Sequence, residues 1–357
     1  MKIFLITLEY PPIVGGISTY LHELYANSEH KVIVIAPTNY QFYSWWFWPR
    51  WIPFYFKLVK MVRVQKPDQI HVSHVLPIGI MAHWLKKKFK IPYVIFFHGN
   101  DLLSAHAQQG KWKRVVAIVQ GAARVIVNSE ATKKLYVELL SKSQEPFVVL
   151  PGVDIPATGA SAFVSGAHQL LDTYALNGTR IILFLARLIP RKGVTVALDA
   201  MTLLMKENIE ATLVIVGDGP ERAAAEQHAQ DLNLYNRVRF IGRVSDEQKW
   251  KWYSVAHVFW FPAQPIKNDW EGFGIASLEA QSAGCPVVVS NIGGLPESVE
   301  NNVSGLICEP TAEAFAQTTA QLLNNAMLWQ NMRAAARTFA SKHSWKKSRD
   351  EFGLIIR

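Results

Sequence analysis

The alternation of short apolar runs with helical segments constrains the fold of this chain most. In residues 1–150 the runs are KIFLITL, KVIVIAP, QIHVSH, YVIFFHG, RVIVNS and FVVLPG. Each is almost wholly apolar, as strands buried on both faces are. Helical patterns lie between most of them, over residues 18–26, 79–89 and 130–140. This βαβ rhythm predicts an α/β fold with a parallel, doubly wound sheet.

The second half repeats this rhythm. Its expected strands are RIILFLAR, ATLVIVGDG, VRFIGRV, HVFWFPA, PVVVSNIGG and GLICEP, and its expected helices span 195–208, 220–232, 246–255, 273–283 and 312–341. Between the halves, residues 151–179 are rich in Gly, Ala, Ser and Pro and are expected to form a linker. Since open α/β sheets bind ligands outside the carboxyl ends of their strands, we expect the ligand site in a cleft between two such domains.

The charge of the chain is concentrated in its first half. Residues 1–150 hold 18 Lys and Arg against 8 Asp and Glu, whereas the remainder holds 19 against 20. This asymmetry favours a polyanion or an anionic membrane surface as a partner of the first half. Nucleic acid is not expected, because neither zinc-finger spacing nor an RNA-binding signature occurs. The two cysteines, Cys285 and Cys308, are too few for a disulfide framework, which suggests a reducing compartment.

An aromatic stretch, NYQFYSWWFWPRWIPFYFKLVK, spans residues 39–60. Its charged residues and prolines argue against a transmembrane helix, and residues 57–65 are expected to form an amphipathic helix. For the rest, buried aromatic packing, insertion into a membrane interface and contact with another protein remain open. The membrane interface is favoured, because Trp and Tyr prefer that zone and nearby basic residues attract anionic lipid. The residues concerned are Trp45, Trp46, Trp48 and Trp51.

The stretch EGFGIASLEAQSAGCPVV (residues 271–288) carries the strongest chemical signal. Glu271 and Glu279 are eight residues apart, and Gly272 and Gly274 precede an expected helix. The free amides of a helix N-terminus bind anions, and glycines let a phosphate or sugar approach the backbone. Glu279, two turns into that helix, could accept hydrogen bonds from a ribose diol. The alternative is an ordinary helix start with an incidental glutamate pair.

Three further segments follow expected strands. In LARLIPRKG, the residues Arg187, Arg191 and Lys192 suit a diphosphate, although solvated surface charge is the usual role of such residues. In LEYPPIVGG, the pair Gly15 and Gly16 opens a helix without the full dinucleotide fingerprint, so NAD is not predicted. A phosphate or sugar contact and a plain tight turn are both compatible with that pair. In FFHGND, His98 and Asp101 form a polar cluster, although an isolated histidine is more often structural.

Taken together, these residues resemble the retaining glycosyltransferases of the GT-B fold, the large family that includes phosphatidylinositol mannosyltransferases and sucrose synthases. The resemblance runs through EYPPIVGG, HGND, ARLIPRKG, VGDGPE, FIGRV, EGFGIASLEAQSAGCPVV and GGLPE. It implies two Rossmann-like domains that face a cleft: an acceptor-binding domain over 1–160 and a donor-binding domain over 161–341. The segment HSWKKSRDEF resembles the helix of this family that returns to the first domain, here expected within 342–357.

The resemblance also implies roles for residues. Arg187 and Lys192 would hold the donor diphosphate, and Glu271 would hold hydroxyls of the donor sugar. His98 would contact the transferred sugar, and Asp101 would lie on the acceptor side. The remaining donor contacts would come from the glycine pair Gly15 and Gly16, the backbone of Val244, Lys249 beside the base, the amides of Phe273, Gly274 and Ile275, and Glu279 at the ribose.

The family is usually thought to retain configuration by a same-face substitution, so no nucleophile is assigned. The chain has no Asp-x-Asp triplet, and two cationic side chains can replace a metal, so we expect neither metal nor cofactor. An epimerase of the same architecture would need an acid and a base at the sugar ring, which the sequence does not reveal. A non-catalytic sugar-nucleotide-binding protein would be expected to lose Glu271, Arg187 or Lys192. Phosphorylase-like chemistry would need a pyridoxal phosphate lysine and a longer chain.

The donor is expected to be GDP-mannose, because FPAQPIKNDWEG resembles the corresponding loop of mannosyltransferases that act on mannosylated phosphatidylinositol. A UDP-glucose or other UDP-sugar transferase with a soluble acceptor is the alternative. The expected acceptor is lipid-linked or a saccharide. The apolar run after Lys2 is too short for a signal peptide. A cytoplasmic enzyme bound peripherally to the inner face of the membrane is therefore expected.

Overall fold

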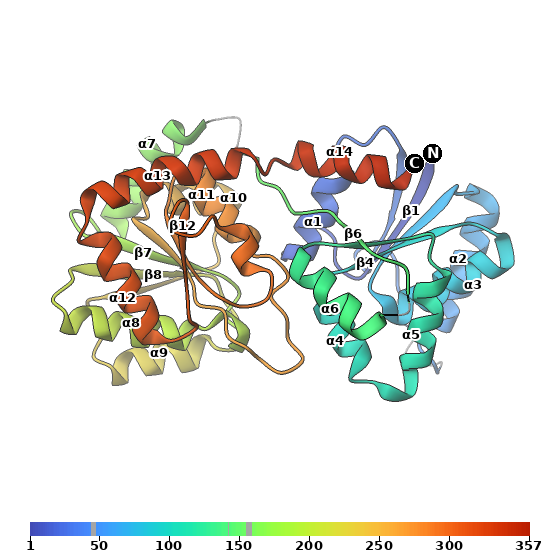
Figure 1. Ribbon diagram of the computed structural model, residues 1–357, viewed down its shortest axis with the longest axis horizontal. Coiled ribbons are helices and arrows are strands. Elements are labelled where there is room, and N and C mark those ends of the chain that lie inside the picture. The colour runs from blue at the N-terminus through green and yellow to red at the C-terminus, as the bar shows by residue number, and fades with distance from the viewer. Residues whose placement is uncertain (44–47, 142, 155–158) are drawn as a thin grey trace. The chain divides into compact units, whose positions relative to one another are not determined.

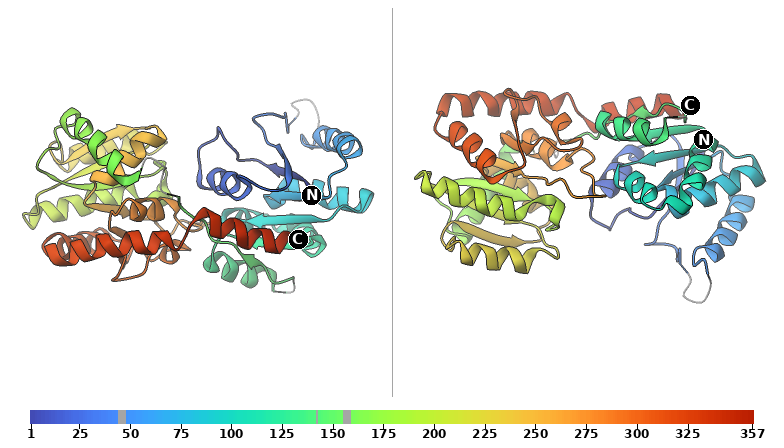
Figure 2. Two further views of the ribbon diagram at one scale, coloured as in Figure 1. Left: turned by 90° about the horizontal axis from the view of Figure 1, so that it is seen from above. Right: turned by 60° about the horizontal axis from the view of Figure 1, so that its bottom comes forward.

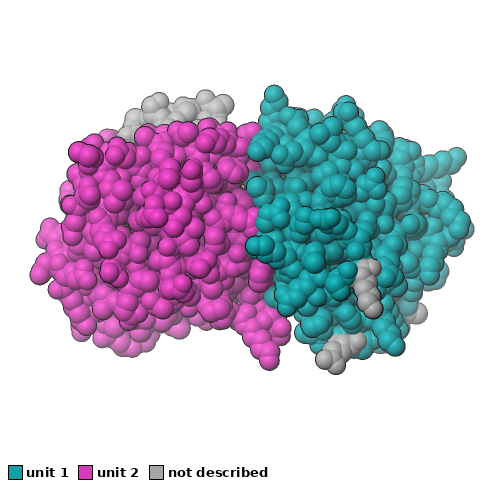
Figure 3. Space-filling model, in the orientation of Figure 1, with its two compact units in different colours: residues 1–151, 345–357 teal, residues 152–344 magenta. Residues whose placement is uncertain are grey.

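The computed structural model describes residues 1–43, 48–141, 143–154 and 159–357, apart from the side chains of 109 and 159–165. The chain divides into two compact units: unit 1 comprises residues 1–151 and 345–357, and unit 2 comprises residues 152–344 (Figure 3). The boundary between the two units falls after Pro151, whereas the sequence analysis placed the end of the first domain at residue 160. Residues 159–173 form helix α7, which packs on α10 (Asp246–Val255) of unit 2. Much of the expected linker is therefore helix.

Unit 1 is built on a six-stranded parallel sheet with helices on both faces (Figure 1). The strand order is β2-β1-β3-β4-β5-β6. The strands are β1 (Lys2–Thr7), β2 (Lys31–Ile35), β3 (Gln69–Ser73), β4 (Tyr93–Phe97), β5 (Arg124–Val127) and β6 (Phe147–Val148). The helices are α1 (Gly16–Tyr25), α2 (Ile52–Gln65), the π-helix η1 (Val75–Gly79), α3 (Ile80–Phe89), α4 (Asn100–His106), α5 (Gln109–Gly121), α6 (Glu130–Leu140) and α14 (Trp345–Ile356).

Unit 2 has a second six-stranded parallel sheet, in the order β12-β11-β10-β7-β8-β9. The strands are β7 (Arg180–Leu185), β8 (Ala211–Val216), β9 (Val238–Gly242), β10 (Val258–Phe261), β11 (Val287–Ser290) and β12 (Gly305–Cys308). Besides α7 and α10, the helices are η2 (Pro190–Lys192), α8 (Val194–Lys206), α9 (Arg222–Asp231), α11 (Ile275–Ser282), η3 (Leu295–Ser298), α12 (Ala312–Leu323) and α13 (Ala326–Ser341).

The apolar runs are explained by burial on both faces of each sheet. In β7, Ile182 and Phe184 pack into the core beneath α8 and α12, whereas Ile181 and Leu183 pack into the core beneath α10 and α11. Successive strand side chains point to opposite faces, so a strand covered on both sides needs apolar residues at every position. The continuous runs predicted these strands for that reason.

Each sheet has one point where the direction of strand addition reverses. In unit 1 the chain passes from β1 to β2 on one side and then to β3 on the other side of β1. In unit 2 it passes from β7 through β8 to β9 and then to β10 on the other side of β7. Loops diverge at such switch points, so the carboxyl ends of β1 and β3, and of β7 and β10, are where ligands bind in this fold class.

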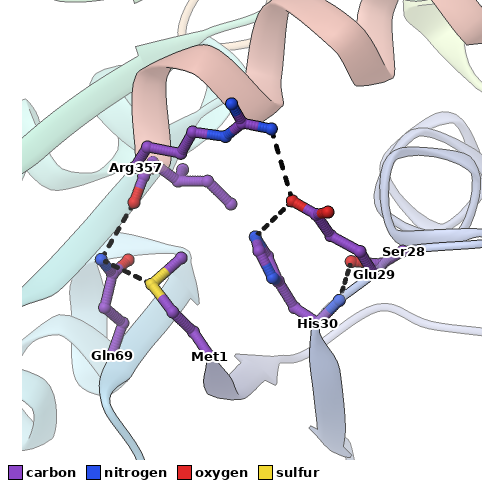
Figure 4. Close-up of polar contacts among 7 residues, drawn as sticks. Met1, Ser28, Glu29, His30, Gln69 and Arg357 are labelled. Atoms are coloured by element: carbon purple, nitrogen blue, oxygen red, sulfur yellow. Dashed lines mark hydrogen bonds and ion pairs between the residues drawn. The ribbon is translucent and has the colours of Figure 1, made fainter.

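The last helix, α14, packs on α1 and completes unit 1 (Figure 1). The ring of Phe352 lies 5.3 Å from that of Tyr25, edge to face, and Ser348 Oγ donates a hydrogen bond to the Leu150 carbonyl at 2.7 Å. Both chain ends lie on unit 1 (Figure 2). At the end of the helix, Gln69 Nε2 donates to the Ile356 carbonyl at 3.0 Å, and Arg357 lies 3.5 Å from Glu29 (Figure 4). Aromatic packing and these polar contacts fix the returning helix.

Several expected boundaries differ from the structure. The helix expected over 312–341 is two helices, because Asn325 begins a new one: its Oδ1 accepts a hydrogen bond from the Leu328 amide at 3.0 Å. The helix expected over 57–65 begins at Ile52, with a proline in its first turn, where the missing N–H has no cost. Helices α4 and α5 were not predicted.

Candidate functional site

A cluster of charged side chains lies at the switch point of unit 2. Lys192, which ends η2 after β7, places its Nζ 2.7 Å from Glu271 Oε2 in the loop after β10. Arg191 also pairs with Glu271, and its Nε donates to Asp269 Oδ1 at 2.8 Å. Arg191 and Glu271 are buried. Buried charges are tolerated when they are paired, so these contacts fix the geometry of the cluster.

Lys192 is held in surroundings that disfavour its charge. Burial lowers the pKa of Lys192, and the neighbouring Arg191 lowers it further, while Glu271 opposes both. The ammonium also lies 4.4 Å from the ring centroid of Phe261. A bound anion would therefore gain a strong interaction with this poorly hydrated cation. The charges of Arg191 and Lys192 are balanced by those of Asp269 and Glu271 within the cluster. Arg187, in the same loop, is exposed.

The loop from Glu271 to Gly274 delivers the chain to the N-terminus of α11. Gly274 has φ +89°, and a Cβ there would overlap the Leu295 side chain. The Gly294 amide donates to the Glu271 carbonyl at 2.9 Å, and a Cβ at Gly293 would overlap that carbonyl. The glycines thus allow one tight loop to pack on another. The amides of Phe273, Gly274 and Ile275 lie at this helix start, where N–H groups lack intrahelical acceptors.

A second polar group surrounds Glu279 on α11. Lys249 Nζ lies 2.9 Å from Glu279 Oε1, and the Tyr253 hydroxyl donates to Oε2 at 3.0 Å. Burial favours a low pKa for Lys249, but the charges and hydrogen bonds of Glu279 and Asp246 together outweigh burial, and the pKa is raised. Burial, together with Glu279, holds the pKa of Tyr253 well above its usual value. The carboxylate is thereby fixed and can still accept bonds from a diol. Val244, two residues after β9, is half-buried.

Backbone contacts hold together the loops that follow strands β7, β8 and β9. The Leu188 amide donates to the Asp218 carbonyl at 3.0 Å, and the Gly217 amide donates to the Gly242 carbonyl at 2.8 Å. Gly217 has φ +129°, and a Cβ there would overlap the Ala186 carbonyl. The VGDG segment therefore has a structural reason for its glycines: it brings the loops after β7, β8 and β9 together.

Two contributors to this site were missed in the sequence. One is Asp269, which was not singled out. It lies two residues before Glu271, in a polar segment that the sequence analysis treated only as a loop. Tyr253 follows Lys249 by one helical turn, a spacing that places both on one face of α10. Of the basic residues named in LARLIPRKG, Arg191 and Lys192 make ion pairs in the cluster, whereas Arg187 is exposed.

In unit 1, His98 lies at the end of β4 and is buried. Its Nε2 is 3.1 Å from Ser73 Oγ, and its ring contacts that of Tyr20 edge to face at 5.6 Å. Burial, with a smaller effect of nearby His74, lowers the pKa of His98 to about 3. The imidazole is therefore neutral at physiological pH and can exchange hydrogen bonds with a hydroxyl.

Asp101 fixes the turn that carries His98. Its Oδ1 accepts a hydrogen bond from the His98 amide at 2.9 Å at the start of α4. Gly15 has an extended backbone that any residue adopts, and a Cβ on Gly16 would meet no atom within 4 Å among the described residues. A Cβ on Gly15 would lie 3.3 Å from Glu9 Oε2, so the Glu9 side chain would have to move, whereas the described residues leave open space beside Gly16.

The aromatic segment divides between core and surface. Phe42 and Phe54 are buried and stack with centroids 4.2 Å apart, while Trp51 contacts Trp84 of α3 at 5.3 Å. By contrast, Trp48 is 83% exposed. Buried packing therefore explains the Phe pair, and an interaction surface remains open for Trp48. Trp45 and Trp46 lie outside the described residues.

Basic residues adjoin this aromatic surface. Lys57, Lys60 and Arg63 are exposed along α2, while Leu58 and Val62 are buried, as the amphipathic pattern predicted. Phe56 on the same helix is 65% exposed. None of the helices in the described part of the chain is long and apolar enough to cross a membrane.

Comparisons with known proteins agree with this architecture. The model of glycosyl transferases group 1 matches residues 173–339, and that of glycosyltransferase family 4 matches residues 14–156. A GDP-mannose-dependent monoacylated alpha-(1-6)-phosphatidylinositol monomannoside mannosyltransferase from Corynebacterium glutamicum is 25% identical, over 97% of this chain and 95% of its own length. A GDP-mannose-dependent alpha-(1-6)-phosphatidylinositol monomannoside mannosyltransferase from Mycobacterium tuberculosis is 30% identical, over 62% of this chain and 60% of its own length.

Among solved structures, Anabaena HepE in complex with UDP-glucose superposes with a TM-score of 0.84 at 19% identity, covering 100% of this chain and 99% of that chain. This likeness and the two sheets confirm the predicted fold class of two Rossmann-like, doubly wound domains. The two family models together span most of the sequence. The chain belongs to the glycosyltransferases of the GT-B fold.

Proposed function

We propose that this glycosyltransferase is a retaining, metal-independent hexosyltransferase that moves mannose from GDP-mannose to a lipid-linked or saccharide acceptor at a membrane surface. The observation that carries the proposal is the pairing of Lys192 with Glu271, at 2.7 Å, beside the N-terminus of α11. This pair places an ammonium that can bind a diphosphate next to a carboxylate that can bind sugar hydroxyls, at the switch point of unit 2.

The roles follow from the chemistry of these side chains. Lys192 and Arg187 supply positive charge where the leaving diphosphate gains negative charge, and the first amides of α11 add hydrogen bonds there. The carboxylate of Glu271 accepts hydrogen bonds from sugar hydroxyls. Glu279, fixed by Lys249 and Tyr253, accepts bonds from the ribose diol. This division gives each part of a nucleotide sugar a matching group.

In the proposed reaction, the bond between the anomeric carbon and the diphosphate oxygen breaks through an oxocarbenium-like state. The acceptor oxygen forms its bond to the same face of that carbon, and its proton passes to the leaving phosphate. The positive charge of Lys192 and Arg187 stabilises the departing group, which is why we propose that no metal is needed. Neutral His98 would hydrogen-bond the transferred sugar.

The membrane surface enters the proposal through unit 1. Exposed Trp48 and Phe56 adjoin the basic face of α2, a combination that suits the interface of an anionic bilayer. The two mannosyltransferase relatives are named for phosphatidylinositol monomannosides, which are lipid acceptors. The proposed site of action is therefore the inner face of the membrane, with the enzyme bound peripherally.

A UDP-sugar transferase with a soluble acceptor is the second candidate. HepE, which shares the fold, was solved with UDP-glucose. The groups around Lys192 and Glu279 would contact the diphosphate and ribose, which both donors share. They therefore do not choose between guanine and uracil.

The test is a transfer assay with the full chain. GDP-mannose, UDP-glucose and UDP-N-acetylglucosamine are each offered with vesicles that contain mannosylated phosphatidylinositol, and the thermal shift with each donor is measured in parallel. We expect transfer and a raised Tm with GDP-mannose. Glu271→Ala should lose at least ~100-fold in rate, whereas Glu210→Ala, an exposed glutamate in the same unit, should not. A shift with UDP-sugars alone would refute the GDP-mannose donor, and a full rate for Glu271→Ala would refute the site.

A further inference from the structure

Arg191 is a basic residue of the unit 2 cluster whose ion pairs are with two carboxylates of one loop. Its side chain is 11% exposed. The guanidinium donates from Nε to Asp269 Oδ1 at 2.8 Å, and its Nη1 donates to Glu271 Oε2. A planar guanidinium can hold two carboxylates at once in a fixed geometry, which an ammonium cannot do. Binding a phosphate as well would require a buried pair to break, so these contacts favour a role other than diphosphate binding for Arg191.

The two carboxylates lie in the loop between β10 and α11. Residues 262–274 run between these elements without helix or strand. The Gln264 amide donates to the Arg191 carbonyl at 2.8 Å, so the backbone of η2 holds the start of this loop. The Arg191 side chain holds the end of the same loop through Glu271. One short helical turn therefore fixes both ends of a segment that has no regular structure of its own.

Arg191 and Lys192 share one oxygen of Glu271. Both contact Oε2, the ammonium at 2.7 Å, whereas none of the described residues forms a hydrogen bond or ion pair with Oε1. The carboxylate is thus fixed through one oxygen, while the other can accept hydrogen bonds from hydroxyl groups. Because Oε2 is shared, Lys192 is paired with a carboxylate whose charge a second cation already offsets.

The groups around Lys192 show what the loss of Arg191 would do. Burial lowers the pKa of Lys192 most, Glu271 and Asp269 from the loop after β10 raise it, and Arg191 from η2 lowers it. The Phe261 ring of β10 lies 4.4 Å from the ammonium. Without Arg191, Lys192 would be the one described cation paired with Glu271. The ammonium would then be held more tightly by the protein and would be less available to a bound diphosphate.

We propose that Arg191 is a positioning residue of the transferase. It holds Glu271 so that one carboxylate oxygen stays open to hydroxyls of the donor sugar, and it shares the other oxygen with Lys192, which leaves the ammonium able to bind the diphosphate. Asp269 fixes the guanidinium in this position. Arg191 itself touches neither sugar nor phosphate. The inference rests on the proposed function, although not on which nucleotide base the donor carries.

Steady-state kinetics with the full chain test the proposal. The variants are Arg191→Met and Arg191→Lys, which keeps the charge but loses the forked geometry. The control is Arg333→Met, because Arg333 is a half-buried arginine of unit 2 whose Nε donates to the Gly284 carbonyl at 3.0 Å. Gly284 follows the end of α11, whereas Glu271 precedes its start. Values of kcat, donor KM and Tm are measured with GDP-mannose, UDP-glucose and UDP-N-acetylglucosamine, each with vesicles that contain mannosylated phosphatidylinositol.

We expect Arg191→Met to lower kcat by roughly 10- to 100-fold with a smaller rise in donor KM, because Glu271 and Lys192 leave the geometry that the transition state needs. Arg191→Lys should recover Tm but only part of kcat, and Arg333→Met should keep the kcat of the wild type. A full kcat for Arg191→Met at a reduced Tm would assign Arg191 to folding alone. A rise in donor KM larger than the fall in kcat would assign it to ground-state donor binding, and either result would overturn the proposal.

The titration of Lys192 is a second readout, one that a purely structural role would not change. The Cε NMR signal of Lys192, identified by its loss in Lys192→Met, is followed against pH without donor. Arg191→Met removes a cation that lowers the pKa of Lys192, so this pKa should rise. It should stay unchanged in Arg333→Met. An unchanged or lower pKa of Lys192 in Arg191→Met would overturn the sharing of Glu271 on which the proposal depends.

The positioning role and the proposed function fail in different ways. If the wild type transfers sugar and Arg191→Met keeps its kcat, only the positioning role is wrong. If the wild type transfers no sugar from any of the three donors, the proposed function is wrong. In that case a raised pKa of Lys192 in Arg191→Met would still retain the action of Arg191 on Lys192, and an unchanged pKa would defeat it too.

Discussion

The two units place contrasting side chains at the same point of the same kind of sheet. At the switch point of unit 2, Lys192 and Arg191 face Glu271 in a buried, charged cluster. At that of unit 1, Glu9 and His74 lie 3.8 Å apart in the lining of a hollow of about 240 Å³, and no Lys or Arg among the described residues lines it. The contrast shows that two sheets of the same kind present different side chains at the same position, because the loops that follow their strands differ in sequence.

The largest expected effect is a loss of transfer rate when Lys192, at the switch point of unit 2, is replaced. Lys192→Met removes the buried ammonium but leaves Glu271 paired with Arg191, so the fold should persist. Transfer should fall by about 10²–10⁴-fold, because charge on the leaving group loses its stabilisation. Steady-state rates measure this, with Lys206→Met, an exposed lysine of α8, as the control. A loss below ten-fold would show that Lys192 does not serve the leaving group.

Paired glycine variants compare how tightly the two units are built. Gly274→Ala in unit 2 should cost roughly 2–4 kcal/mol of unfolding free energy, because φ is +89° and the new Cβ overlaps Leu295. Gly16→Ala in unit 1 meets open space and should cost less than about 1 kcal/mol. Urea unfolding measures both. If Gly16→Ala lowers transfer without lowering stability, the space beside it serves a ligand; equal stability costs in the two variants would contradict this account.

Acid should weaken unit 1 through its buried histidines. Burial lowers the pKa of His71 and of His98 to about 3, whereas an unfolded histidine titrates near 6.5. Between these values the unfolded state binds more protons, so stability is lost as the pH falls from about 6.5 towards 3. Each histidine should contribute roughly 1–3 kcal/mol to the difference between pH 7 and 4.5. Urea unfolding at both pH values measures it. His71→Phe should reduce this dependence, and an unchanged dependence would count against the burial of a neutral imidazole.

The smallest effect concerns the aromatic surface of unit 1. Changing Trp45, Trp46 and Trp48 to Ser should weaken binding to anionic vesicles by about five- to ten-fold, because interfacial Trp contacts are lost. Vesicle co-sedimentation measures binding, and Phe147→Ser, a partly exposed aromatic residue elsewhere in unit 1, is the control. Rates with a water-soluble acceptor should not change. If the triple variant co-sedimented with anionic vesicles as much as the wild type does, the proposed membrane contact of this surface would be wrong.

The sheets could be predicted because burial on both faces leaves a continuous apolar signal, as in β7 and β8. Helices α4 and α5 were missed, although in α5 the buried residues Val115, Ile118 and Val119 have the spacing of one helix face. Lys192 and Glu271 were singled out in loops that follow strands, and Glu279 in the helix after such a loop, and the structure has them there. Their partners Asp269 and Tyr253 were not singled out. Ion pairs between distant segments depend on how loops close, which local patterns do not encode.

The hollow of unit 1 shows the same limit. Glu9 and His74 are 65 residues apart in an unremarkable sequence context, and only the order of β1 and β3 brings them together. The positive φ of His74 has no sequence signature, since the residue is not Gly or Asn. A hollow lined by single residues of separate loops becomes visible only with the fold.

Titration of GDP-mannose into the wild type, Lys192→Met and Glu9→Gln tests the central claim most directly. If unit 2 holds the diphosphate and unit 1 holds the acceptor, Lys192→Met should raise the donor Kd by at least ~10-fold. Glu9→Gln should leave it unchanged. An unchanged Kd for Lys192→Met, or an equal loss of affinity in Glu9→Gln, would contradict the division of roles between the two units.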